Sequence, residues 1–107
     1  MDYFLGIDLG SSSVKVSILD GKKGKSIISC NYPEKEMDIF SLQSGWAEQD
    51  PDYWWECVVS CFKKLNKKID FSLIASVGIS YQMHGLVLID KNGKSLRKSI
   101  IWCDSRA

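Results

Sequence analysis

The sequence has no long apolar stretch that could cross a membrane or direct secretion. Its uninterrupted apolar runs, such as residues 86–89, are far shorter than the roughly 20 residues of a membrane-spanning helix. The second residue is Asp2, and Asp8 follows the apolar residues 4–7 at once, so neither the basic start nor the apolar core of a secretory signal is present. These absences argue against a membrane partner and predict a cytoplasmic protein.

The sequence also lacks an excess of one charge and a pattern of metal ligands. Fourteen Lys and Arg residues against thirteen Asp and Glu residues leave a formal net charge of +1, so no nucleic-acid partner is expected. The four cysteines form no C-x-x-C pair, and the single histidine, His84, stands apart from them. The pattern argues against a structural zinc site and predicts reduced, mostly buried thiols.

The length fits one folded domain. The chain has 107 residues, of which 45% are hydrophobic and 25% are charged. An enzyme that joins two substrates usually closes a cleft between domains, and a single domain of this size forms only one wall of such a cleft.

The N-terminal third alternates in hydrophobicity with a period of two. Residues 3–9, 14–19 and 26–32 are expected to form three consecutive antiparallel strands, with the first in the centre of a sheet and buried on both faces. A Gly-Ser-Ser-Ser turn at residues 10–13 and the Asp20-Gly21 pair separate these strands. Residues 33–45 show no sustained period and are expected to form a loop.

A helix is expected to begin at Asp50-Pro51 and to run to about Lys68. Asp accepts hydrogen bonds from free N–H groups of the first turn, and Pro at the first helical position loses no bond. An apolar stripe along the helix predicts that it packs on the sheet, and it comprises Trp54, Val58, Cys61, Phe62 and Leu65. Residues 45–51 are interpreted mainly as an anchor and a helix cap.

The remaining residues read as strands. Residues 73–80 are expected to lie parallel to the first strand after a crossover, and residues 85–90 and 95–102 can pair as a hairpin around the turn at 91–94. The predicted fold is an α/β domain with a mixed sheet in β-β-β-α-β order, followed by a β-hairpin.

Three segments carry groups suited to chemistry. In the first, Asp8 ends a strand where Mg²⁺ could meet its carboxylate, and Gly10, Ser11 and Ser12 form a turn that suits nucleotide phosphates, with Lys15 close behind. A Ser-rich hairpin turn with an exposed aspartate explains the same residues equally well on local composition.

The second and third segments offer polar groups at the ends of strands. Gln82 and His84 can each donate and accept hydrogen bonds, as a polyhydroxylated substrate requires, and Met83 can cover an apolar C–H face. Trp102, with the acceptor Asp104 and the donor Arg106, could line a small polar pocket. A partly buried loop histidine and a surface Asp-Arg pair are the ordinary alternatives.

Together these segments resemble the N-terminal part of the FGGY family of carbohydrate kinases, and within it the kinases of xylulose. The resemblance rests on residues 6–15, on Trp46-Ala47-Glu48-Gln49-Asp50-Pro51 with Trp54-Trp55, on Gln82-Met83-His84-Gly85 and on Trp102-Cys103-Asp104-Ser105-Arg106. One departure is Cys103, which stands where such kinases commonly carry Asn.

The resemblance implies a ribonuclease-H-like domain of the actin, sugar kinase and Hsp70 superfamily, with residues 1–107 as the N-terminal part of the first of two such domains. It implies ATP and Mg²⁺ as cofactors, a small sugar as substrate, and a homodimer as one form of the complete protein. Asp8 then helps to place Mg²⁺-ATP, Gly10, Ser11, Ser12 and Lys15 face the phosphates, and Gln82, Met83, His84, Trp102, Asp104 and Arg106 line the sugar site. The general base lies outside these 107 residues, so the chain alone is expected to be inactive.

Three alternatives remain at this point. One is an FGGY kinase for another sugar or polyol, such as ribulose, gluconate or glycerol. Another is a non-catalytic, actin-like binding or regulatory module. A nucleic-acid-processing ribonuclease-H fold fits poorly, because only Asp8 resembles one of its several metal carboxylates and the net charge is close to zero.

Overall fold

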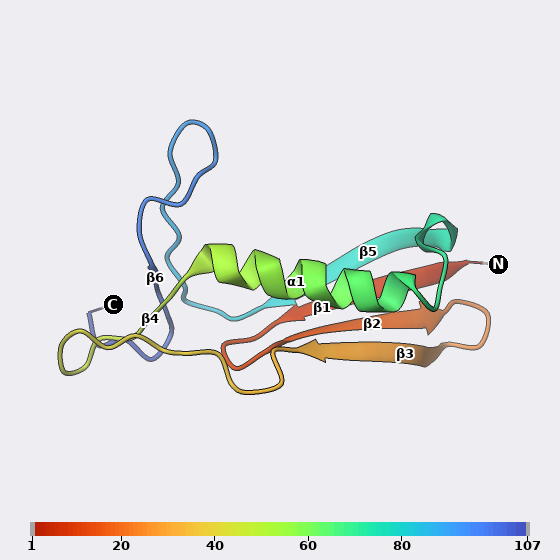
Figure 1. The fold of residues 1–107 in the computed structure, drawn as a ribbon, viewed down its shortest axis with the longest axis horizontal. Helices are drawn as coiled ribbons and strands as arrows, with labels where there is room; N and C mark the ends of the chain where they lie inside the picture. The colour runs from red at the N-terminus through yellow and green to blue at the C-terminus, as the bar shows by residue number, and fades with distance from the viewer. Residues whose placement is uncertain (1, 107) are drawn as a thin grey trace.

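The computed structural model describes residues 2–106 and contains two sheets and one long helix (Figure 1). The main sheet has the order β3-β2-β1-β5, and it is formed by β1 (Tyr3–Leu9), β2 (Val14–Asp20), β3 (Lys25–Tyr32) and β5 (Ile74–Tyr81). The second sheet pairs β4 (Glu48–Gln49) with β6 (Ser99–Ile100). The helix α1 (Pro51–Asn66) and the short 3-10 helix η1 (Phe71–Leu73) lie between β4 and β5 in the chain.

The main sheet is mixed, as predicted. Strand β1 lies in its centre, antiparallel to β2 and parallel to β5, so that Leu5 stands opposite Ile18 on one side and Val77 on the other. Two parallel neighbours need a long crossover, and α1 supplies it. The predicted β-β-β-α-β order and the α/β fold class are confirmed.

Helix α1 packs lengthwise on one face of the sheet (Figure 1). Asp50 caps its N-terminus by accepting a 2.9 Å hydrogen bond from the backbone N–H of Asp52, and the helix ends at Asn66, two residues before the predicted end. The predicted apolar stripe is buried, except that Phe62 is half-buried and stacks edge-on against Phe71. Its contacts with β2 and β3 form the centre of the core.

The other face of β1 is open, which corrects one premise of the sequence analysis. Leu5 points toward the helix and is buried, whereas Gly6 and Asp8 are exposed on the opposite face. The expectation that β1 is buried on both faces is therefore wrong for residues 2–106. The carboxylate of Asp8 is exposed, so burial gives no reason to expect a cation beside it.

The segment after β5 forms a looser hairpin than predicted. The turn closes through a 2.8 Å hydrogen bond from the N–H of Asp90 to the carbonyl of Lys94, and the two arms are linked by isolated bridges at Leu86–Ile100 and Ile89–Ser95 and by a 2.9 Å hydrogen bond from the N–H of Leu96 to the carbonyl of Leu88, without a continuous ladder. Ile100 lies between Leu86 and Glu48 and bridges to both. The regular pairing of residues 99–100 is with β4 rather than with the first arm of the hairpin. A two-residue strand has no periodicity, and sequence patterning did not predict β4.

The cysteines are free, and the two on the inner face of α1, Cys57 and Cys61, are buried as expected. Burial, with a smaller contribution from a hydrogen bond to Cys30, raises the pKa of the Cys61 thiol to about 12. Cys103 is exposed. No helix within residues 2–106 is both long and apolar enough to span a membrane.

Candidate functional site

A hollow of about 500 Å³ lies on the open face of the main sheet and contains Asp8. Asp8 and Lys15 are direct cross-strand partners in β1 and β2, and both side chains line the hollow. Gly6 and Gly78 form a second cross-strand pair, and a Cβ atom at either glycine would meet nothing within 4 Å. The two glycines therefore leave open space beside the carboxylate of Asp8.

The carboxylate of Asp8, the ammonium group of Lys15 and the open space beside them fit a nucleotide bound together with a divalent cation. Mg²⁺ is held by one or two carboxylates and keeps water and phosphate oxygens as its other ligands. Within residues 2–106 no group of three or more His, Cys, Asp or Glu side chains could form a cage for a metal, so Asp8 can supply one ligand only. Lys15 can meet a phosphate from the neighbouring strand.

The turn after β1 is held by a close contact of its own backbone and by hydrogen bonds from two distant segments. A Cβ atom on Gly10 would lie 3.0 Å from the carbonyl oxygen of Ser13, so the tight turn needs glycine there. The carbonyl of Ser12 accepts a 2.8 Å hydrogen bond from the N–H of Met37. The carbonyl of Ser11 accepts a 2.6 Å hydrogen bond from Nε2 of Gln49.

Trp102 reaches the same turn from the other end of the chain. Its indole Nε1–H donates a 3.2 Å hydrogen bond to Oγ of Ser11, and 57% of the residue remains exposed. The structure thus brings together two segments that were predicted to serve the nucleotide and the sugar respectively.

The segment after β5 begins under the turn and then turns outward. The N–H of Gln82 donates a 2.9 Å hydrogen bond to the carbonyl of Leu9, and Nε2 of Gln82 donates a 3.4 Å hydrogen bond to Oε1 of Gln49. Oε1 of Gln82 is buried and has no hydrogen-bond partner among the described residues, which leaves an acceptor free for a hydroxyl donor.

Met83 and His84 are exposed beyond Gln82. His84 has a φ of 60°, a left-handed conformation that non-glycine residues adopt rarely and at a cost. Strain of this kind is concentrated at functional positions.

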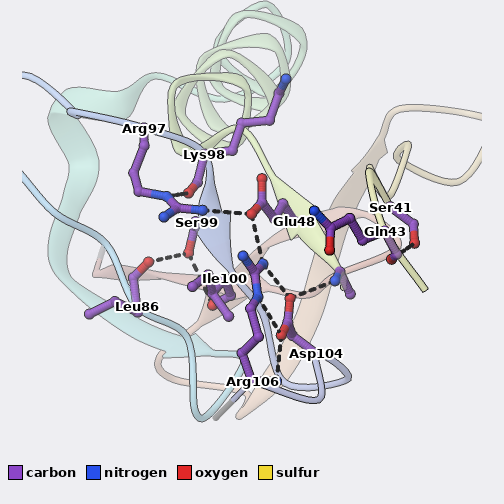
Figure 2. Close-up of polar contacts among 11 residues, drawn as sticks. Ser41, Gln43, Glu48, Leu86, Arg97, Lys98, Ser99, Ile100, Asp104 and Arg106 are labelled. Carbon is purple, nitrogen blue, oxygen red and sulfur yellow. Dashed lines mark hydrogen bonds and ion pairs between the residues drawn. The ribbon is translucent and has the colours of Figure 1, made fainter. Parts of the chain in front are cut away.

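A cluster of ion pairs holds the C-terminal segment (Figure 2). This Glu48 cluster consists of Glu48, Arg97, Asp104 and Arg106. Oε2 of Glu48 lies 2.6 Å from Nη2 of Arg97 and 2.7 Å from Nη2 of Arg106. Oδ2 of Asp104 accepts 2.6 Å hydrogen bonds from Nη2 of Arg106 and from the N–H of Ala47.

The Glu48 cluster lowers the pKa of both its carboxyl groups. The hydrogen bond from Arg106 is the main cause for Glu48 and for Asp104, and burial opposes it in both cases. The same two carboxylates raise the pKa of Arg106, whose guanidinium also stacks 3.8 Å from the ring centre of Trp46.

The Asp104 side chain is 0% exposed, and both of its oxygens are bound within the chain. Asp104 and Arg106 therefore support the segment that carries Trp102. Their contact with a sugar stays a prediction.

Two residues that matter for this geometry were missed. Glu48 and Gln49 were interpreted as part of a helix cap, yet both are buried and bind distant segments. One signal was available in the sequence. Two polar residues stand between Ala47 and the helix cap Asp50, with no glycine or proline between them to form a turn.

Comparison with known proteins gives a consistent result. Residues 3–107 match the family described as the FGGY family of carbohydrate kinases, N-terminal domain. A xylulose kinase from Staphylococcus epidermidis is 38% identical over 104 residues, which cover 95% of this chain and 20% of that protein. The chain thus spans about a fifth of the length of the curated relatives it matches.

Solved structures agree with this match. A structure described as a xyloylose kinase from Brucella ovis superposes with a TM-score of 0.86 at 34% identity, over 97% of this chain and 22% of that one. A gluconate kinase from Lactobacillus acidophilus superposes with a TM-score of 0.83 at 31% identity, over 96% of this chain and 20% of that one. The predicted ribonuclease-H-like fold of the sugar kinases is confirmed.

Proposed function

The chain belongs to the FGGY family of carbohydrate kinases, and from this premise we propose that it is the N-terminal part of an ATP-dependent sugar kinase. The proposed reaction transfers the γ-phosphoryl group of ATP to a hydroxyl of a ketopentose, with D-xylulose giving D-xylulose 5-phosphate. Residues 1–107 would form part of the first of two ribonuclease-H-like domains. The general base and most of the adenine site then belong to the other four fifths of such an enzyme.

On the nucleotide side, the proposal assigns Asp8, Lys15 and the turn at residues 10–12. Asp8 supplies a carboxylate to Mg²⁺, which would neutralise charge on the phosphates during transfer. Lys15 adds a positive charge from β2, and the glycines Gly6 and Gly78 leave room for the phosphates. These groups position and stabilise charge, which is the main work of a protein in phosphoryl transfer.

On the sugar side, the proposal assigns Gln82, Met83, His84 and Trp102. The free acceptor of Gln82 and the imidazole of His84 suit hydroxyl groups, while Met83 and Trp102 suit the apolar faces of a sugar. Asp104 and Arg106 complete this side by holding Trp102 in place. We assign His84 to affinity and Asp8 to turnover.

One observation carries the proposal: the 3.2 Å hydrogen bond between Trp102 and Ser11. It joins a segment suited to a sugar to a turn suited to phosphates, across 91 residues of chain. Phosphoryl transfer requires both substrates to lie side by side, and a binding module for either ligand alone would not need this contact.

A chimera tests the proposal directly. In the xylulose kinase of Staphylococcus epidermidis, the 104 residues that match this chain are replaced by the corresponding residues of this chain. An ADP-release assay with D-xylulose is expected to show turnover by the chimera and none by the 107-residue chain alone. A folded chimera without activity on any sugar, or turnover by the chain alone, contradicts the proposal.

Two substitutions in the chimera separate the assigned roles. Asp8→Ala is expected to abolish turnover and leave sugar binding largely intact, with Asp38→Ala in the exposed loop as the matched control. His84→Ala is expected to raise KM for the sugar more than it lowers kcat. Loss of sugar binding in Asp8→Ala would show that this division of roles is wrong.

The identity of the sugar is tested with a panel, because the gluconate kinase superposes almost as well as the xyloylose kinase. We expect kcat/KM of the chimera to be highest for D-xylulose among D-xylulose, D-ribulose, D-gluconate and glycerol. A higher value for D-gluconate moves the proposal to that substrate and leaves the kinase assignment in place.

A further inference from the structure

We propose that Gln49 is a positioning residue that couples the nucleotide side of this site to its sugar side. The inference rests on the proposed function for the names of the two sides, but its geometric part concerns only Ser11, Gln49 and Gln82. Gln49 is only 2% exposed, so its polar side chain must find its hydrogen-bond partners within the chain.

The amide of Gln49 bonds in both directions. Its Nε2 donates a 2.6 Å hydrogen bond to the carbonyl of Ser11, in the turn after β1. Its Oε1 accepts hydrogen bonds from Nε1 of Trp54 at 3.0 Å and from Nε2 of Gln82 at 3.4 Å. One buried side chain therefore holds the turn, the start of α1 and the segment after β5 at fixed separations.

The hydrogen bonds of Gln49 to Ser11 and Gln82, called the Gln49 bridge below, join residues next to both groups of candidate ligand contacts. Ser11 is one residue from Gly10 and Ser12 in the turn, and Gln82 is one residue from Met83. A displacement of Ser11 by a bound phosphate is transmitted through two hydrogen bonds to Gln82, whose own Oε1 is free to receive a sugar hydroxyl. Because the same amide bonds to both segments, a movement of one segment changes the hydrogen bond to the other.

Gln49→Glu separates the two halves of the bridge. The introduced carboxylate can still accept from Trp54 and Gln82, but it has no N–H to donate to the carbonyl of Ser11 and repels that oxygen. Protonation gives the carboxyl group an O–H that can donate again. Burial raises the pKa of a carboxyl group, so the bridge to Ser11 should break and re-form within an accessible pH range.

The first readout is the indole N–H signal of Trp102 in the ¹⁵N-labelled 107-residue chain without ligand. Trp102 donates to Oγ of Ser11, so its signal reports the position of the turn. We expect this signal to titrate between about pH 5 and pH 9 in Gln49→Glu, and to return to the wild-type position at the acidic end. The same substitution at the exposed Gln43 is the control, and it should leave the signal of Trp102 unchanged.

The second readout is the coupling between two ligands. Affinity for D-xylulose is measured in the chimera by isothermal titration calorimetry with and without Mg²⁺-ADP, which cannot donate a γ-phosphoryl group. In the chimera that carries the wild-type residues we expect Mg²⁺-ADP to raise this affinity at least about fivefold, the lower end of couplings measured between sites. In Gln49→Leu the ratio should fall to about one. Trp54→Phe removes the indole bond to Gln49, keeps an aromatic side chain in the core and should keep the wild-type ratio.

The outcomes distinguish this inference from the proposed function. Gln49 is not a positioning residue if the Trp102 signal fails to titrate in Gln49→Glu, or if Trp54→Phe abolishes coupling as fully as Gln49→Leu. If Gln49→Leu does not fold, Gln49→Glu and Trp54→Phe decide the question. If the wild-type chimera turns over D-xylulose but Mg²⁺-ADP leaves its affinity for the sugar unchanged, the coupling falls and the proposed function stands. A folded wild-type chimera without activity contradicts the proposed function, and the ligand-free titration then decides whether Gln49 positions the turn.

Discussion

Truncation of Ile101 should show how strongly the core holds the segment that carries Trp102. The Ile101 side chain is 0% exposed and belongs to the main hydrophobic cluster, and its backbone N–H donates a 3.1 Å hydrogen bond to the carbonyl of Ala47. The next residue, Trp102, points outward to Ser11. Ile101→Ala removes the apolar anchor and leaves the polar contacts of its neighbours in place.

The expected loss follows from the buried volume. Ile101→Ala removes three buried carbon groups, and at about 0.8 kcal/mol for each the transfer contribution is roughly 2.4 kcal/mol. The cavity left behind adds to this, and substitutions of this kind cost about 2–5 kcal/mol. Small domains have a free energy of unfolding of about 5–15 kcal/mol, so the variant should fold but with a much smaller free energy of unfolding than the wild type.

Urea unfolding followed by circular dichroism measures this loss. The transition midpoint of Ile101→Ala should fall by about 1–2 M with an unchanged slope. Leu96→Ala is the matched control, because Leu96 is 63% exposed and its truncation should cost no more than about 0.5 kcal/mol. In the folded variant, the indole N–H signal of Trp102 should also shift because the segment is less firmly held.

The reasoning is refuted if Ile101→Ala and Leu96→Ala unfold at the same urea concentration. That result would mean that the segment after β6 contributes nothing to the cooperative core. The Glu48 cluster would then be its main attachment.

Three further predictions test other parts of the structure. Because the pKa of Asp104 is lowered in the folded state, its ionised carboxylate stabilises the fold at pH values above the unfolded pKa of about 3.9. This contribution is lost as pH falls through the lower folded pKa, so the unfolding free energies of wild type and Asp104→Asn should converge as pH falls from about 5 toward 2. Iodoacetamide at about pH 8 should label the exposed Cys103 quickly and Cys61 hardly at all, as measured by mass spectrometry, because the raised pKa and burial of Cys61 keep it a protected thiol. In the chimera, Gly78→Val should place a side chain in the hollow beside Asp8 and abolish binding of Mg²⁺-ADP while binding of D-xylulose remains, as measured by isothermal titration calorimetry, with Ser76→Val on the same face as the control.

The parts of the fold that were predictable are those encoded locally. The period-two alternation of β1, β2 and β3 and the capped amphipathic helix α1 are each specified by residues within one element. The parallel placement of β5 followed from the handedness and length of a crossover. The exposure of Asp8 was not predictable, because both faces of β1 carry apolar residues and only tertiary packing decides which face the helix covers.

Local chemistry in the sequence suggested most residues of the candidate site, but it did not predict Glu48 and Gln49 or the arrangement of the site. Ser11 and Trp102 were each identified from local chemistry, but their contact depends on a hydrogen bond between residues 91 positions apart. Likewise, Asp104 looked like a free acceptor from sequence, whereas the structure pairs it with Arg106 and the N–H of Ala47. Such contacts depend on how residues 47–48 and residues 97–106 meet in the fold, and no local sequence pattern predicts that.

The two-residue strand β4 explains why these distant segments meet. Successive side chains of a strand point to opposite sides, so Glu48 and Gln49 face in different directions. Glu48 binds Arg97 and Arg106, while Gln49 binds Ser11 and Gln82. Because β4 leads directly into the cap of α1, the helix fixes the position of both side chains. A pair of polar residues that sequence patterning assigns to a helix cap thus holds the turn after β1, the segment after β5 and the C-terminal segment in one arrangement.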